Sequence, residues 1–145
     1  MPLSPSRTGL RARLAAVCRK HPVTLAYLFG SHARGTADAE SDIDVAVVAQ
    51  PSLSREDRQR LRFRLLRACD DALPLPHARI DIVVLQDVPI LLQYNVVRSG
   101  QVLFARTPDV RRVFELDVER RYEDEQPLLD QEAALTVDRI LAHAA

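Results

Sequence analysis

Two aspartates separated by a single residue stand at the start of an apolar run, in the stretch GSHARGTADAESDIDVAVV from Gly30 to Val48. In an extended strand, residues two apart share a face and lie about 7 Å from each other, so Asp42 and Asp44 should project in parallel. Asp81 stands likewise inside the apolar run RIDIVVL. An unpaired carboxylate on a buried strand costs several kcal/mol. These charges therefore require a compensating group.

Divalent cations are the compensation that such a set of carboxylates fits. Magnesium prefers a few carboxylates together with water and substrate phosphate oxygens. Two such ions about 3.5–4 Å apart stabilise both the attacking and the leaving oxygen of a displacement at phosphorus. We therefore predict that Asp42, Asp44 and Asp81 lie at a site for two Mg²⁺ ions. Asp87 follows the apolar run close to Pro89 and is expected to be a solvated turn residue instead.

Gly30 and Ser31 can supply the phosphate-binding half of such a site. A glycine lets the backbone approach a triphosphate closely, and the N–H groups and hydroxyl that follow it can donate to phosphate oxygens. A plain Gly-Ser turn is the alternative, but the D-x-D ten residues later favours the phosphate site. This is not a Walker loop, because GSHARG is followed by Thr36 and Ala37 rather than by lysine and a hydroxyl residue.

Length and composition predict one globular domain. The chain has 145 residues, of which 47% are hydrophobic and 28% charged. Its 20 basic and 20 acidic residues argue against direct nucleic-acid binding, which needs a basic excess. We expect a cytoplasmic protein with no membrane association, since no apolar run approaches a span and the N-terminus lacks a signal-peptide core. Cys18 and Cys69 fall on apolar helix faces and should be core thiols.

Periodicity predicts an α+β fold in which helices flank a small mixed central sheet. The arginines of the helix that begins near Ser54, among them Arg55, Arg58 and Arg62, are expected to form its solvated face. In chain order, we expect a helix ending before Pro22, then strands at 23–29 and 43–49 with a turn through Gly35 between them. A helix capped by Ser54 and Asp57 and ended by Pro74 follows, and then a strand at 78–85. The rest of the chain is expected to form a helix from Pro89 to Arg98, an edge strand at 101–104, and two helices after Pro108 that are divided by Pro127.

These motifs resemble those of a known family. Gly-Ser, then ten residues, then D-x-D, with a later lone aspartate on a strand, resembles the nucleotidyltransferase superfamily built on the DNA polymerase beta palm. The strings VVRSGQVLF and RRVFELDVERRYEDEQPLL make the chain similar to the minimal nucleotidyltransferase (MNT) antitoxins, the partners of HEPN-domain toxins. The resemblance spans about residues 10–130, and it implies a polymerase-beta-palm-like fold.

The resemblance also implies roles for individual residues. Gly30 and Ser31 would hold the triphosphate of ATP, Asp42 and Asp44 would ligate the metal ions, and Asp81 would be the third carboxylate, which helps to activate the incoming hydroxyl. Such antitoxins transfer AMP from ATP to a tyrosine of the toxin, which blocks its RNA-cleaving site. Arg34 is a candidate phosphate contact, with a surface arginine or a salt bridge as the alternative.

Two other functions are open at this point. A small-molecule nucleotidyltransferase, such as those that modify aminoglycosides, usually carries a further substrate-binding domain that 145 residues scarcely accommodate. A non-catalytic module that only masks the toxin is disfavoured by the intact Ser31, Asp42, Asp44 and Asp81, because costly buried charges tend to be lost once catalysis is lost.

The C-terminal part of the chain is a candidate docking surface. We treat residues 1–145 as a single nucleotidyltransferase domain in which 107–145 form a C-terminal helical segment. That segment carries 5 basic and 10 acidic residues, a net charge of −5. Either it docks a basic toxin through charge and its leucines, or those leucines are buried internally. The arginine-rich helix from Arg55 to Arg67 is the alternative docking surface.

Overall fold

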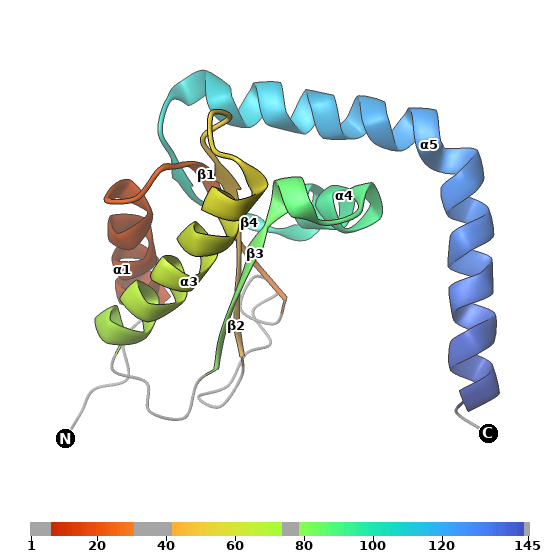
Figure 1. Ribbon diagram of the computed structural model, residues 1–145, viewed down its shortest axis with the longest axis horizontal. Helices are drawn as coiled ribbons and strands as arrows, with labels where there is room; N and C mark the ends of the chain where they lie inside the picture. The colour runs from red at the N-terminus through yellow and green to blue at the C-terminus, as the bar shows by residue number, and fades with distance from the viewer. Residues whose placement is uncertain (1–6, 31–41, 74–78, 144–145) are drawn as a thin grey trace.

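The structure is a computed structural model that describes residues 7–30, 42–73 and 79–143, with side chains described between Gly9 and Gln126. The described residues form a four-stranded sheet in the order β3-β2-β1-β4 (Figure 1). Its central strand β1 runs antiparallel to both neighbours, whereas β2 and β3 are parallel. The predicted mixed sheet is therefore confirmed. The strands are β1 (Val23–Phe29), β2 (Ile43–Ala49), β3 (Ile80–Val84) and β4 (Gln101–Ala105).

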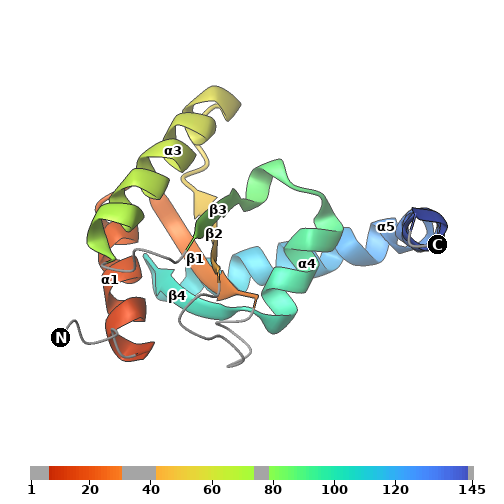
Figure 2. The ribbon, with the colours of Figure 1, turned by 90° about the horizontal axis from the view of Figure 1, so that it is seen from below.

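Helices cover both faces of this sheet (Figure 2). One face packs against α1 (Arg7–Arg19) and α3 (Arg55–Ala72), where alternate residues of β2 such as Ile43 and Val45 join the larger apolar core. The other face packs against α4 (Ile90–Ser99), and Ala46 and Val48 project there. Because both faces are covered, the central strands are almost continuously apolar. An aspartate in such a strand therefore stands out.

The start of α3 has the cap that its sequence predicted. Ser54 has an extended backbone, and its hydroxyl accepts a hydrogen bond of 3.1 Å from the backbone N–H of Asp57. This bond satisfies one of the backbone donors left free by the first helical turn. Beyond the cap, Leu61, Leu65 and Cys69 are buried against the sheet, as their spacing indicated.

Both cysteines are buried free thiols, which confirms the sequence prediction. Burial raises the pKa of Cys18 to about 12, with a smaller contribution from the neighbouring Cys69. Burial likewise raises the pKa of Cys69 to about 11. Both therefore stay protonated near neutral pH and act as small apolar core residues, since a nucleophile or a metal ligand needs the thiolate.

The last helix, α5, attaches to the body of the protein through its first half. The ring of Tyr122 stacks on that of Tyr94 in α4, with 3.7 Å between their centroids. The buried hydroxyl of Tyr27 in β1 donates a 2.8 Å hydrogen bond to Glu115, which also accepts from Arg111 at 2.9 Å. Burial raises the pKa of Tyr27, and the hydrogen bond to Glu115 adds to that rise.

The predicted division at Pro127 is wrong in one respect. The structure has one helix, α5 (Pro108–His143), through that position. Figure 1 shows that this helix changes direction along its length. A proline removes one backbone hydrogen bond and clashes with the preceding turn, so it bends a helix more readily than it ends one when the flanking residues favour helix. The side chains beyond Gln126 lie outside the described residues, so docking by this segment stays a prediction.

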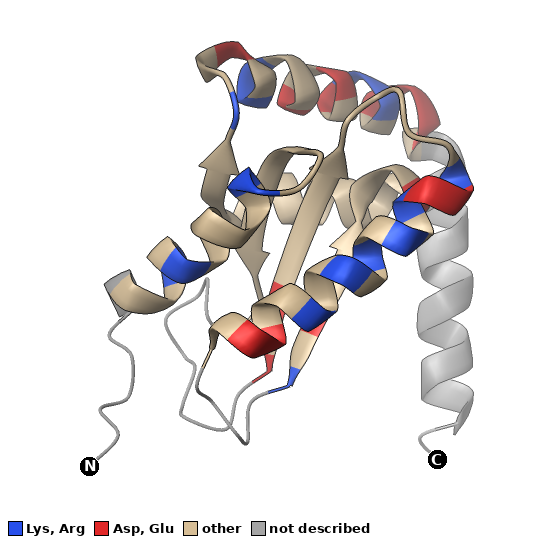
Figure 3. Ribbon diagram, turned by 60° about the vertical axis from the view of Figure 1, so that its left-hand side comes forward, with Lys and Arg blue, Asp and Glu red and all other residues tan. Residues whose placement is uncertain are grey.

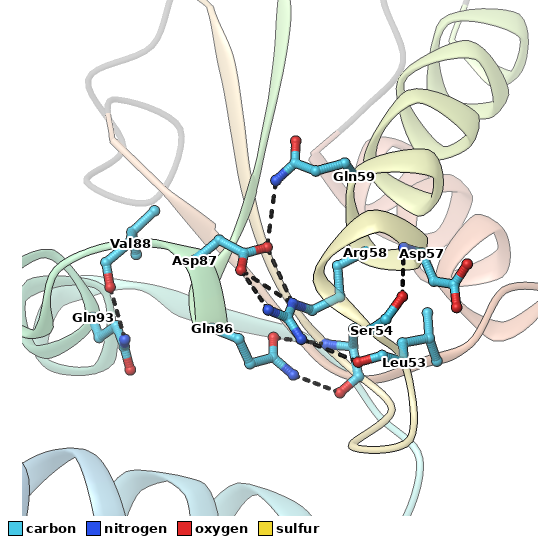
Figure 4. A network of polar contacts seen from close by, with 10 residues as sticks. Leu53, Ser54, Asp57, Arg58, Gln59, Gln86, Asp87, Val88 and Gln93 are labelled. Atoms are coloured by element: carbon cyan, nitrogen blue, oxygen red, sulfur yellow. Dashed lines mark hydrogen bonds and ion pairs between the residues drawn. The ribbon is translucent and has the colours of Figure 1, made fainter.

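The solvated positions predicted for Arg58, Arg62 and Asp87 are also wrong. The guanidinium of Arg58 donates to both carboxylate oxygens of Asp87, the shortest bond being 2.7 Å (Figure 4). The two side chains are only 20% and 10% exposed. The hydrogen bonds to Asp87 raise the pKa of Arg58. Arg62 donates a 2.7 Å bond from Nε to the carbonyl of Ile82 in β3.

The ion pair and a neighbouring glutamine fasten the segment that follows β3. This segment is a short 3-10 helix, η1 (Leu85–Asp87), which begins where the strand was expected to end. The side-chain amide of Gln86 donates to the carbonyl of Ala49 at 2.7 Å and accepts from its N–H at 3.1 Å. The far ends of β2 and β3 and the start of α3 are thus joined by side chains (Figure 4).

None of the described helices is both long and apolar enough to cross a membrane.

We predict that Asp87→Ala lowers the free energy of unfolding by about 1–3 kcal/mol, because it leaves the half-buried Arg58 guanidinium without its acceptor. Urea denaturation followed by circular dichroism measures this change. Arg60→Ala is the matched control, since Arg60 and Asp57 form an exposed pair with side chains 72% and 52% accessible. Such a pair contributes at most about 1 kcal/mol. Equal effects of the two substitutions would contradict the structural role of the Arg58–Asp87 pair.

Candidate active site

Two of the predicted aspartates lie side by side at one end of the sheet. In the parallel pairing of β2 with β3, Asp44 is the register partner of Asp81. Residues in register on neighbouring strands project to the same face, and the strands are about 4.8 Å apart. Both aspartates are half-buried. The fold therefore places two carboxylates from residues 37 positions apart in the sequence next to each other.

Asp42 lies just before β2 and is exposed. Within the described ranges, no three histidine, cysteine, aspartate or glutamate side chains gather into a group that could hold a metal ion. The strand register thus brings Asp44 and Asp81 together, and the part of Asp42 in a metal site stays a prediction. The hard carboxylate oxygens of the pair are of the kind that Mg²⁺ prefers, and a ligand set completed by substrate phosphate is usual for this ion.

Gly30 passes directly over the carboxylate of Asp44. It follows β1, whose last residue, Phe29, is the antiparallel register partner of Asp44. Gly30 has a φ of +72°, in the left-handed region that favours glycine. A Cβ atom placed on Gly30 would run into the Asp44 carboxylate. The positive φ favours glycine here, and a Cβ atom at this position would also force the Asp44 carboxylate to move.

The remaining predicted site residues fall elsewhere. Ser31, Arg34 and the turn through Gly35 lie outside the described residues, and their roles stay predictions. Asp87, the alternative third carboxylate, is separated from Asp81 by the rest of β3 and by η1, and it faces α3 instead. Asp81, and not Asp87, therefore lies beside Asp44.

The fold and this site together define a class of protein. The family model described as polymerase beta, nucleotidyltransferase, matches residues 13–109 of the chain. The matched segment contains Gly30, Asp44 and Asp81. The chain belongs to the polymerase beta nucleotidyltransferase family, as its motifs indicated.

Within that family the chain is similar to antitoxins. Protein adenylyltransferase MntA of Shewanella oneidensis is 31% identical over 121 residues, which cover 83% of this chain and 78% of that protein. A toxin–antitoxin crystal structure with AMP-PNP is 26% identical with a TM-score of 0.61, over 85% of this chain and 98% of that one. A chain of a toxin–antitoxin structure of MntA, in which two aspartates two positions apart are replaced by glutamate, is 25% identical with a TM-score of 0.60, over 85% of this chain and 98% of that one.

We predict that Gly30→Ala abolishes nucleotide binding, because the methyl group collides with Asp44 and the backbone must adopt a left-handed conformation that costs about 1–2 kcal/mol for alanine. Calorimetric titration with the ATP analogue AMP-PNP measures the affinity. Gly30→Asn separates the two causes, since asparagine tolerates the left-handed region but brings the same Cβ atom. If Gly30→Asn binds normally, the close approach to Asp44 is not required.

Proposed function

We propose that this protein is an antitoxin adenylyltransferase, which transfers AMP from ATP to a tyrosine of a cognate HEPN-domain ribonuclease toxin and so neutralises it. The observation that carries the proposal is the in-register pair of Asp44 and Asp81, with the turn at Gly30 packed against the first of them. The similarity to a protein adenylyltransferase and to a toxin–antitoxin structure with an ATP analogue supports the choice of reaction and of partner.

The reaction is an in-line displacement at the α-phosphorus of ATP. The phenolic oxygen forms the new P–O bond, the bond to the β-phosphate bridge oxygen breaks, and pyrophosphate leaves with the electron pair. The phenolic proton passes to a base, and we assign this part to a carboxylate oxygen of Asp81. Catalysis then rests mostly on positioning the reactants and on neutralising charge.

Each site residue has a part in that displacement. The backbone of Gly30 and the hydroxyl of Ser31 hold the triphosphate, and Arg34 contacts a phosphate. Two Mg²⁺ ions held by Asp42, Asp44 and Asp81 would supply the charge neutralisation that the transferred and leaving groups require. The half-buried pair of carboxylates fits that ion, because Mg²⁺ takes one or two protein carboxylates along with phosphate oxygens and water.

We also propose that residues 1–145 act as one nucleotidyltransferase unit, with 107–145 as its C-terminal helical segment. The first half of α5 packs on α4 through Ile90 and Val118, and Tyr27 in the central strand donates to Glu115. These contacts support a single unit rather than a sheet domain with a loosely attached helix. The protein would act in the cytoplasm, where ATP and the toxin's RNA substrates are found.

We predict that Asp44→Asn and Asp81→Asn each reduce AMP transfer by at least about 100-fold, because each removes charge stabilisation from the transferring group. Intact-mass spectrometry of the toxin, taken as the HEPN-domain protein encoded beside this chain, counts the AMP groups added. Asp109→Asn, an exposed aspartate of α5, is the control and should transfer normally.

Both active-site variants are expected to keep their fold, since each side chain lies near the end of its strand and is only half-buried. Thermal unfolding checks this. If folded Asp44→Asn modifies the toxin at the normal rate, the catalytic assignment fails. If neither the native protein nor Asp44→Asn adds AMP, and both still inhibit the toxin, then the protein acts by masking the toxin and not as an enzyme.

We predict that ATP binding requires a divalent cation, because the turn GSHARG contains no lysine to neutralise the triphosphate. Calorimetric titration with ATP in EDTA should show almost no binding, and adding Mg²⁺ in excess should restore it. Undiminished affinity in EDTA would contradict the metal site. GTP titrated under the same conditions tests the base preference.

A further inference from the structure

A row of exposed side chains follows one face of α3. Arg60, Phe63, Arg64 and Arg67 stand at helical spacings of three and four residues, so they share a face. Figure 3 shows the basic residues of α3 following one another along its length. Phe63 is 64% exposed, the largest exposure among the large apolar side chains of the described residues. We call these four residues the α3 stripe.

The α3 stripe borders a groove of about 600 Å³ between α3 and the start of β3. The position of the groove relates the stripe to the active site, because Ile80 in its wall directly precedes Asp81. The groove is lined by Phe63, Leu66, Arg67, Asp70, Asp71, Arg79 and Ile80.

The polar contacts of α3 make the stripe a rigid surface. The ion pair of Arg58 with Asp87 and the bond of Arg62 to Ile82 fix α3 to the outer edge of β3. The guanidinium of Arg62 also lies 5.8 Å from the centre of the Phe63 ring. A preorganised aromatic side chain loses little conformational entropy when a partner covers it, so it can contribute strongly to binding.

If the nucleotide is held at Gly30 as proposed, the order of the strands indicates the side from which an acceptor can arrive. The turn at Gly30 follows β1, Asp44 is on β2 and Asp81 is on β3, which is the outer strand on that side. A nucleotide held at Gly30 leaves the β3 side for the incoming hydroxyl. Asp81 projects to the α4 face and the groove lies on the α3 side, so an acceptor protein reaches both by straddling the outer edge of β3.

From this geometry we infer that the α3 stripe docks an acidic segment of the protein that receives AMP, with Phe63 as the apolar anchor. This inference rests on the proposed function. Within the described residues Arg64 and Arg67 form no ion pair, so both guanidinium groups are available to carboxylates of a partner. Arginine and aromatic residues are enriched at the centres of protein interfaces, and the guanidinium fork binds carboxylates with two hydrogen bonds.

Two substitutions test the surface without touching the active site. Phe63→Ser removes the anchor, and Arg64→Glu reverses a charge. The control is Lys20→Glu, which reverses an exposed charge just after α1 and lies on neither candidate docking surface. Calorimetry measures AMP-PNP affinity, initial rates over a range of toxin concentrations give kcat and KM, and titration without nucleotide gives the Kd for the toxin.

Each α3 substitution is expected to raise KM and Kd for the toxin at least about tenfold. The affinity for AMP-PNP and kcat at saturating toxin should stay within about twofold, because neither residue contacts the reacting atoms. The Lys20→Glu control should change nothing. Raising the salt concentration should slow association of the native protein more than that of Arg64→Glu, because salt screens the attraction of exposed charges.

The outcomes separate this inference from the proposed function. Unchanged KM and Kd in the α3 variants overturn the docking surface alone. A native protein that neither binds nor modifies the toxin overturns both the docking surface and the proposed function. Toxin binding that depends on Phe63, without AMP transfer by the native protein, supports the surface and overturns the proposed reaction. If the α3 variants instead lose affinity only for a single-stranded RNA oligonucleotide, the stripe binds nucleic acid and the inference is overturned.

Discussion

The register between β2 and β3 is the constraint on which the rest of the molecule depends. Side chains alternate between the two faces of a strand, so a slip of one residue would move every side chain of β3 to the opposite face. Asp81 would then point into the apolar core beneath α1 and α3, and Ile82 would leave it. The core residues Ile82 and Val84 thus hold the register, and the position of Asp81 beside Asp44 is a consequence of where the apolar side chains must go.

The same constraint explains why glycine is needed at the end of β1. The antiparallel pairing sets Phe29 opposite Asp44, so the next residue must cross the end of β2 at short distance. A Cβ atom at that crossing would displace the Asp44 carboxylate, and the backbone there has a positive φ. A sheet assembled to bury apolar residues therefore delivers, at one end, a backbone turn in contact with a pair of carboxylates. The chemistry follows from a small number of packing requirements.

Local patterns in the sequence predicted most of the fold. The strands at Val23–Phe29 and Ile43–Ala49 and the cap at Ser54 depend on neighbouring residues, and each was recognisable as an apolar run or a turn signal. Asp44 and Asp81 could also be identified, because a charge inside an apolar strand breaks the local pattern. The sequence grouped them at one site, but their direct adjacency depends on the parallel pairing of β2 with β3, which the local pattern did not predict.

Interactions between distant residues were not predictable in the same way. Arg58 and Asp87 are 29 residues apart, and each looks like an ordinary surface charge in its own segment. Arg62 of α3 donates to the backbone carbonyl of Ile82 in β3, a strand 20 residues further along the chain. The periodicity of a helix predicts which of its residues face solvent, but it carries no information about neighbouring elements. Here the edge of β3 and η1 supply acceptors for these arginines.

The hydrogen bond from Tyr27 to Glu115 has a consequence for how the protein comes apart. The tyrosine is fully buried in the central strand, and its hydroxyl finds its acceptor on α5. If the first half of α5 detached while the sheet stayed folded, that hydroxyl would lose its partner inside the protein, at a cost of about 1–3 kcal/mol. Partial opening at this point is therefore disfavoured, and the helix and the sheet should exchange their amide hydrogens as one cooperative unit.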